Sequence, residues 1–266
     1  MGELLSSLAD LVLPGGCAGC AAEGPPLCAR CAAGVPRPWL VVGSGGSADP
    51  GGLPPTVAVG AYSGPLRAAL LAYKERGRRE LAAPLAGLLA RALLDASVAP
   101  ALGAGVSPLA RPSWLVPAPS RASAARMRGG PHVFALVERM AEQLAARSAS
   151  AGGSLGSSAA LRMRRGGRDS VGLDAAARSA NLRGRVLVRP DLLPPPGASV
   201  LLVDDVLTTG ATLRACAEVL RAAGVAVSGA VVLCDASGGL AVWRRWPPGR
   251  PANRVGTGRP VRRPPG

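Results

Sequence analysis

The sequence predicts an α/β fold in which a parallel, Rossmann-like sheet is flanked by helices and preceded by a small separate module. Apolar runs at residues 199–203 and 225–233 are typical of strands buried on both faces, as in parallel sheets. Helical periodicity fills residues 213–221 between them and ends near Gly224. Two closely spaced cysteine pairs stand apart from these patterns, near the start of the chain.

Length and composition set limits on the function. A chain of 266 residues can hold one substantial core and one small module. The formal net charge of +15 favours polyanionic partners such as nucleic acid or phosphorylated substrates. No apolar run reaches the ~18 residues of a membrane span. Residues 1–14 carry two acidic groups and no basic group, unlike a secretory signal, so we expect a docking helix there and a cytoplasmic protein.

The cysteines follow the spacing C-x2-C-x7-C-x2-C, with members Cys17, Cys20, Cys28 and Cys31. Two such pairs place four thiolates within reach of one tetrahedral Zn²⁺, which would then be structural because its coordination is closed. A redox pair or disulfides are the alternatives, and a cytosolic location disfavours disulfides. We expect residues 1–36 to form a helix and a zinc ribbon, and residues 15–36 to have almost no core apart from the metal site. Metal binding would then supply the folding energy of this module.

Further elements follow from periodicity and from turn residues. We expect a linker at residues 43–55 and strands at residues 56–61 and 114–116. Helices are expected at residues 66–77, 80–96 and 134–144. Residues 148–158 read as flexible, and a helix is expected at 174–181. The α/β domain would span residues 56–240, followed by a disordered basic, Pro-rich tail at 241–266. Cys216 and Cys234 fit buried positions, and His132, the only histidine, fits a loop or a helix start.

The chain's central stretch runs from Ser199 to Thr212. Asp204 and Asp205 stand at the carboxyl end of the predicted strand, where open α/β sheets bind ligands. The residues that follow are small, so backbone N–H groups and a helix N-terminus can approach an anion closely. They are Thr208, Thr209, Gly210, Ala211 and Thr212. Two adjacent carboxylates suit neutral hydroxyls. A site that binds a phosphate beside hydroxyl groups fits a ribose 5-phosphate. The alternative is that the strand, turn and helix bind no ligand.

Two basic segments precede this stretch in the sequence. Arg121, Arg126 and Arg128 follow the strand at residues 114–116 and suit a diphosphate, although a solvated basic loop is the alternative. Residues 161–169 are also strongly basic.

Residues 203–212 resemble the phosphoribosyl pyrophosphate (PRPP) motif of type I phosphoribosyltransferases. The resemblance implies that fold. It also implies that Asp204 and Asp205 bind the ribose hydroxyls and act in catalysis, that Thr208 to Thr212 bind the 5′-phosphate, and that Mg²⁺ accompanies PRPP. Arg121 and Arg128 would lie on the pyrophosphate side, and residues 162–168 would belong to a mobile loop.

The order of motifs from the cysteines to residue 235 resembles the ComF family of competence-associated phosphoribosyltransferase-like proteins. Its members usually read Arg-Gly-Phe-Asn-Gln where this chain has Arg128-Gly-Gly-Pro-His132, and Gln where Ser170 stands. Both departures lie near the expected acceptor side.

The resemblance implies transfer of phosphoribosyl to a nitrogen acceptor and an association with DNA uptake. The alternative is a non-catalytic protein that keeps the PRPP site and binds single-stranded DNA or proteins of the uptake machinery. Few aromatic residues, 3% of the chain, are present for base stacking. A thiol oxidoreductase built on the cysteine pairs is a third reading. The residues reveal no obvious general base.

Overall fold

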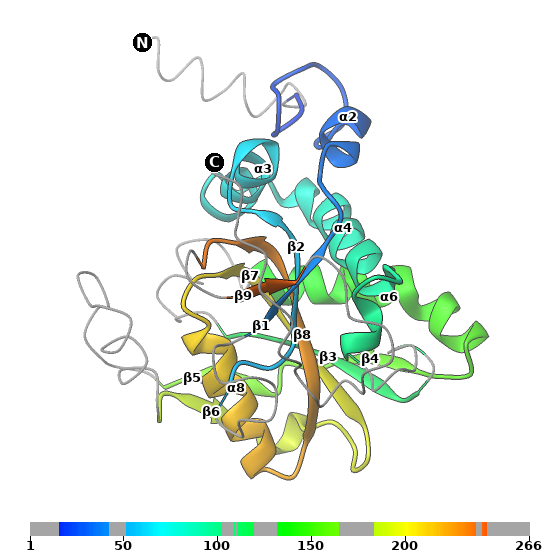
Figure 1. The fold of residues 1–266 in the computed structure, drawn as a ribbon, viewed down its shortest axis with the longest axis vertical. Coiled ribbons are helices and arrows are strands. Elements are labelled where there is room, and N and C mark those ends of the chain that lie inside the picture. Colours follow the sequence, from blue (N-terminus) through cyan, green and yellow to red (C-terminus); the bar gives the residue numbers. More distant parts are fainter. Residues whose placement is uncertain are drawn as a thin grey trace.

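The computed structural model describes residues 16–42, 52–102, 109, 111–119, 132–164, 184–237 and 241–243, without the side chains of 42 and 241–243. Within these residues the main sheet has seven strands in the order β4-β3-β7-β8-β2-β1-β9, and β5 and β6 form a second, two-stranded sheet (Figure 1). The strands of the main sheet are β1 Trp39–Val42, β2 Thr56–Ala61, β3 Ser113–Pro117, β4 Leu155–Ser157, β7 Ser199–Leu207, β8 Ala226–Asp235 and β9 Ala241–Trp243.

Five neighbouring strands of the main sheet, from β4 to β2, are parallel, whereas β1 and β9 add to one edge in antiparallel pairings. Residues 199–203 of β7 are all buried, because β7 lies in the middle of the sheet with helices or strands over both of its faces. The prediction of an α/β fold with a mainly parallel sheet is therefore confirmed.

Helices cover the sheet on both sides, as Figure 1 shows. One face carries α3 Gly64–Glu75, α4 Ala82–Leu94 and α6 His132–Ser150, whose buried leucines pack with Leu201 and Val203 of β7. The other face carries α8 Ala211–Ala222 together with the hairpin of β5 Leu161–Met163 and β6 Val186–Val188. Among the described helices, none combines the length and apolar character that a membrane crossing requires.

The connections around β3 and β7 run in opposite directions. β3 leads through α6 to β4 on one side, and β7 leads through α8 to β8 on the other, although β3 and β7 are parallel neighbours. In open α/β sheets, ligands bind at the carboxyl ends of strands where the connections diverge in this way. The starts of α6 and α8 therefore flank the expected ligand site.

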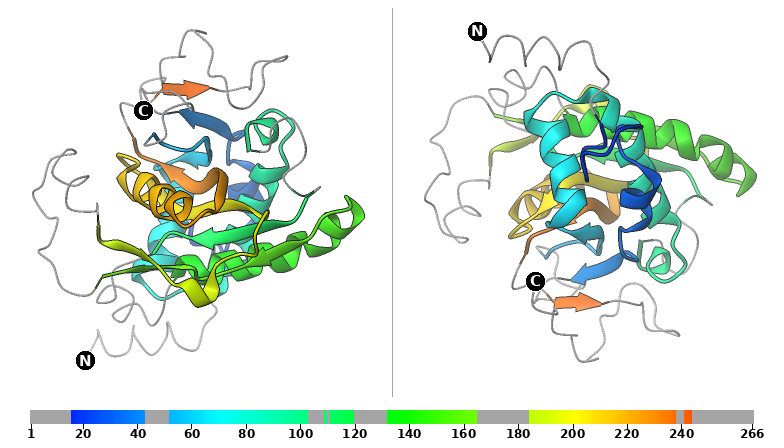
Figure 2. Two further views of the ribbon diagram at one scale, coloured as in Figure 1. Left: turned by 90° about the horizontal axis from the view of Figure 1, so that it is seen from below. Right: turned by 90° about the horizontal axis from the view of Figure 1, so that it is seen from above.

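The cysteine-rich segment packs against the α/β domain and shares its core, contrary to the expectation that it has almost none. Figure 2 shows this segment, which includes the short helix α2 Ala29–Ala33, lying against α3 and α4. Cys17 and Cys31 belong to the same hydrophobic cluster as the buried side chains of α3 and α4. Arg78 donates to the Gly16 carbonyl at 2.7 Å, and Arg91 donates to the Ala32 carbonyl at 3.3 Å.

Several segments differ from the sequence-based expectations. Residues 148–158, expected to be flexible, contain the end of α6 and the edge strand β4, where the small Gly156 lies against the Trp114 ring. Residues 162 and 163, expected in a mobile loop, lie in strand β5 because they pair with β6. Residues 241–243, expected in a disordered tail, pair with β1.

The predicted linker at residues 43–55 also ends in ordered structure. Leu53 is 2% exposed and packs against Gly210 at the start of α8. The expected helices at residues 1–14 and 174–181, and the rest of the tail, lie outside the described residues.

Candidate functional site

Strand β7 carries the acidic pair, Asp204 and Asp205, and extends to Leu207 rather than ending at residue 203 as the sequence predicts. The extension has a physical cause, because Asp204 and Val206 pair with Val232 and Cys234 of β8 and continue the ladder. Side chains alternate along a strand, so the two carboxylates point to opposite faces of the sheet. Asp204 points to the face of α8, and Asp205 points to the face of α3 and α6.

The loop from Thr208 to Thr212, here called the phosphate loop, turns into α8 at Gly210. Gly210 has φ +74°, a left-handed conformation that other residues adopt at a cost. A β-carbon at Gly210 would also lie 2.8 Å from Leu53 Cδ1. The N–H groups of the first turn of α8 and the positive end of its dipole face the loop, which is the arrangement that binds anions.

Side chains around this turn hold its shape. The Thr209 hydroxyl accepts a hydrogen bond from the Ala211 N–H at 3.4 Å. Arg214, one turn into α8, folds back and donates to the Thr209 carbonyl. Thr208 is exposed and Thr212 is partly buried, so both remain near the surface where a ligand can reach them. Arg214 was not among the predicted site residues, although the sequence places it directly after the motif.

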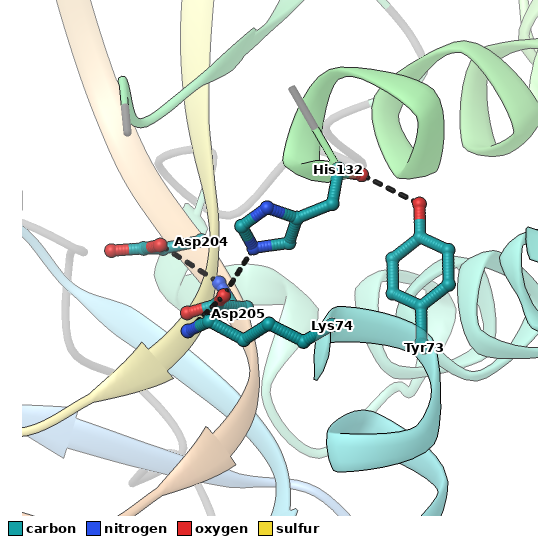
Figure 3. A network of polar contacts seen from close by, with 5 residues as sticks. All are labelled: Tyr73, Lys74, His132, Asp204 and Asp205. Carbon is teal, nitrogen blue, oxygen red and sulfur yellow. Dashed lines mark hydrogen bonds and ion pairs between the residues drawn. The ribbon is translucent and has the colours of Figure 1, made fainter. Parts of the chain in front are cut away.

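Asp205 is bound by two basic side chains from two different helices (Figure 3). Its Oδ2 atom lies 2.7 Å from Lys74 Nζ on α3 and 2.5 Å from His132 Nε2 at the first position of α6. These are the only lysine and the only histidine in the chain. The cluster therefore links α3, α6 and β7 at the carboxyl edge of the sheet.

Tyr73 extends this cluster. Its hydroxyl donates to the main-chain carbonyl of His132 at 2.7 Å, and the two rings stand edge to face with centroids 6.2 Å apart. His132 is thus held by its backbone and by its ring, and both Tyr73 and Lys74 come from the last turn of α3.

The two neighbouring carboxyl groups have opposite pKa shifts. Burial, together with the charge of Asp205, raises the pKa of Asp204 to about 8. Burial opposes ionisation of Asp205 as well, but the hydrogen bond from His132 and the charge of Lys74 lower its pKa to about 2. Asp205 is therefore the more acidic of the two, and Asp204 keeps its proton to a higher pH than a free carboxyl group. In its protonated form, Asp204 does not repel a phosphate that enters beside it.

This difference predicts a pH-dependent effect of Asp204→Asn on stability. A carboxyl group whose pKa is raised on folding stabilises the native state below its unfolded pKa of ~3.9, and this contribution is lost as the pH rises to about 8. The Asn variant lacks this loss. Its free energy of unfolding, relative to the wild type, should rise by about 2–4 kcal/mol between pH 5 and pH 8.

Thermal unfolding of both proteins at the two pH values would measure this difference. Asp191→Asn is the matched control, because Asp191 is exposed and belongs to the short 3-10 helix Pro190–Leu192 rather than to β7. An Asp204→Asn effect that is equal at pH 5 and pH 8 would contradict the assignment.

The four cysteines predicted to bind metal lie close together. Their Sγ atoms are all within 4.8 Å of one another, and Cys20 Sγ is 3.7 Å from Cys28 Sγ. A tetrahedral zinc site with Zn–S bonds of about 2.3 Å has sulfur–sulfur edges of about 3.8 Å. Although burial opposes ionisation of Cys17, hydrogen bonds from the N–H groups of Cys28 and Gly19 lower its pKa to about 6. The donor set therefore fits a tetrahedral, thiolate-binding metal ion.

The remaining predicted site residues divide into two groups. Arg121 and Arg128 lie outside the described residues, as do residues 165–168 of the expected mobile loop. Cys216 and Cys234 are fully buried as expected, and burial raises the pKa of both thiols. His132 begins a helix as expected, but its contact with Asp205 was not foreseen.

Comparisons with known proteins agree with this geometry. Residues 162–248 match the phosphoribosyl transferase domain family. An adenine phosphoribosyltransferase of Polynucleobacter asymbioticus is 41% identical over 68 residues, which are 26% of this chain and 36% of that protein. An adenine phosphoribosyltransferase of Thermobifida fusca is 54% identical over 41 residues, which are 15% of this chain and 23% of that protein.

The chain thus spans about a third or less of the length of these two curated relatives. The domain match includes β7, the phosphate loop and α8, which are the elements that build the candidate site. Over residues 162–248 the chain is therefore similar to the phosphoribosyl transferase domain family, and the parallel sheet with its site at the carboxyl edge agrees with that similarity.

Proposed function

We propose that the chain binds PRPP and transfers its phosphoribosyl group to a nitrogen acceptor. One observation carries the proposal: a left-handed Gly210 turns β7 into α8, so that first-turn N–H groups and threonine hydroxyls meet beside an acidic pair. The phosphate loop would bind the 5′-phosphate. Asp204, on the same face of the sheet as α8, would bind a ribose hydroxyl, and Asp205 would contribute negative charge from the opposite side.

In the proposed reaction the bond between ribose C1 and the pyrophosphate oxygen breaks as the acceptor nitrogen bonds to C1. Pyrophosphate leaves with the bonding electrons, and Mg²⁺ bound with PRPP would offset its charge. The ribose becomes oxocarbenium-like in the transition state, so negative charge near its hydroxyls lowers the barrier. The chain's own contribution is to fix the 5′-phosphate and the ribose relative to the acceptor. Arg121 and Arg128 are proposed to contact the pyrophosphate.

Pyrophosphate release, with Mg²⁺ and PRPP present and a panel of nucleobases and simple amines, tests the proposed function. Adenine belongs at the head of the panel because two relatives are named for it. Release that depends on one acceptor supports the proposal. If no acceptor in the panel causes pyrophosphate release, at protein concentrations that bind PRPP, a binding protein would be favoured instead.

We also propose that the cysteine cluster, consisting of Cys17, Cys20, Cys28 and Cys31, holds one structural Zn²⁺. Four thiol groups at tetrahedral spacing support zinc over an oxygen-loving cation. A reducing compartment such as the cytoplasm would keep these thiols available. Together with the phosphoribosyltransferase-like domain, a zinc ribbon supports the finer assignment to the ComF type, with its association with DNA uptake.

A second candidate function is binding of single-stranded DNA, favoured by the formal net charge of +15. Such binding would be independent of sequence and would weaken steeply with salt, because each neutralised phosphate releases counterions. Fluorescence titration with a labelled oligonucleotide should show at least a tenfold loss of affinity between about 50 and 200 mM salt. An absence of binding at the lower salt concentration would exclude this function.

A further inference from the structure

The Nδ1 atom of His132 has no hydrogen-bond partner among the described residues. The side chain is 7% exposed, and its Nε2 atom is used by Asp205. The Nδ1 atom is buried and makes no hydrogen bond with any described residue. A buried polar atom without a partner costs about 1–3 kcal/mol, and native proteins seldom leave one unexplained. A ligand that donates a hydrogen bond to Nδ1 would remove this cost.

The contact with Asp205 sets which nitrogen of the neutral ring carries the hydrogen. Asp205 is ionised, because Lys74 and His132 both bind its Oδ2 atom and lower its pKa to about 2. An ionised carboxylate only accepts hydrogen bonds, so Nε2 must carry the hydrogen. In the neutral ring Nδ1 therefore keeps a free lone pair. If Nδ1 gains a proton, Asp205 stabilises the resulting imidazolium.

The ring is also held in place at the part of the sheet where a ligand is expected. His132 is the first residue of α6, which follows β3, and Asp205 lies on the neighbouring strand β7. The connections of these two strands diverge at this point. Tyr73 holds the His132 carbonyl, and Figure 3 shows Nδ1 on the side of the ring away from Asp205. A base held by its neighbours in this way needs little reorganisation to accept a proton.

We propose that His132 is the general base of the phosphoribosyl transfer, with Asp205 and Lys74 as its positioning residues. The inference rests on the proposed function. As the acceptor nitrogen bonds to ribose C1, its N–H bond breaks and the proton passes to His132 Nδ1. The C1–oxygen bond breaks at the same time, and pyrophosphate leaves with that electron pair. The imidazolium then returns its proton to water after the product departs.

Nitrogen NMR of the imidazole tests the tautomer directly, because the chain contains one histidine and gives one set of ring signals. The neutral ring should carry its hydrogen on Nε2, with Nδ1 showing the shift of an unprotonated nitrogen. A ring with its hydrogen on Nδ1 would overturn the proposal, whether or not the protein is active.

Two variants separate proton transfer from positioning. His132→Gln can still donate to Asp205 but cannot accept a proton, so kcat should fall by about 10²–10⁴-fold. Its Kd for Mg²⁺–PRPP should stay within about twofold of the wild-type value, because ground-state binding is unchanged. His132→Gly removes the ring, and added imidazole should restore part of its activity in a concentration-dependent way.

Lys74→Met is the matched comparison, because it removes the other partner of Asp205 and leaves the ring present. Imidazole should not restore its activity. If wild type releases pyrophosphate and His132→Gln does so equally fast, the inference fails while the proposed function stands. If wild type binds PRPP but turns over no acceptor, both fail.

Discussion

Gly210→Val should abolish binding of both PRPP and ribose 5-phosphate. A β-carbon there lies 2.8 Å from Leu53 Cδ1, and a β-branched residue resists the left-handed conformation at φ +74°. The turn must shift to accommodate it, and the first N–H groups of α8 move out of line with the phosphate. Affinity measured by calorimetry should fall more than 100-fold, about 2.7 kcal/mol, for both ligands.

Gly224→Val is the matched control for backbone strain. Gly224 has φ +77°, and a β-carbon there meets no atom within 4 Å, at the far end of α8 from the phosphate loop. Both variants should lose about 1–3 kcal/mol of stability, but only Gly210→Val should lose the ligands. If the two variants bind PRPP and ribose 5-phosphate with equal affinity, the 5′-phosphate does not bind at the phosphate loop.

Cys31→Ala should remove the zinc and destabilise the whole chain, not only its N-terminal module. Cys31 is 4% exposed and belongs both to the cysteine cluster and to the core shared with α3 and α4. Losing one of four ligands opens the coordination sphere, and structural zinc sites contribute directly to folding free energy. Elemental analysis should show less than one zinc per chain. The free energy of unfolding should fall by more than about 3 kcal/mol.

Cys216→Ala provides the comparison, because Cys216 is a fully buried cysteine outside the cluster. It should keep its zinc and lose only about 1 kcal/mol. A wild-type protein that contains no metal and has two disulfides among the four cysteines would refute the zinc assignment.

The sequence was sufficient for elements whose signal is local. Residues 200–203 are apolar without interruption, and the structure buries them at the centre of the sheet. The helix ends near Gly77 and Gly224 were predictable because both glycines adopt positive φ just after a helix. The cysteine cluster was predictable because its spacing alone brings four thiols together.

Long-range contacts could not be predicted in the same way. Strand β1 became recognisable only through its pairing with β2, and Leu53 lies in a segment of linker composition, yet it packs against Gly210. The extension of β7 past residue 203 depends on its pairing with β8. It separates Asp204 from Asp205 across the sheet, whereas the sequence suggested a single pair facing one ligand.

The cluster around Asp205 shows the same limit. Lys74 appears in the sequence as a basic residue at a helix end, and His132 as a helix start. Nothing local indicates that they meet on one carboxylate oxygen, because the meeting depends on how α3 and α6 pack on the same face of the sheet. The sole lysine and the sole histidine in an arginine-rich chain were a visible but ambiguous signal.

The central claim is that the turn from β7 into α8 binds a ribose 5-phosphate group. Calorimetric titration of the full chain with PRPP and Mg²⁺, repeated in the presence of ribose 5-phosphate, tests it most directly. We expect saturable binding of one PRPP per chain and competitive displacement by ribose 5-phosphate. Absence of binding at millimolar PRPP, or binding that ribose 5-phosphate does not displace, would contradict it.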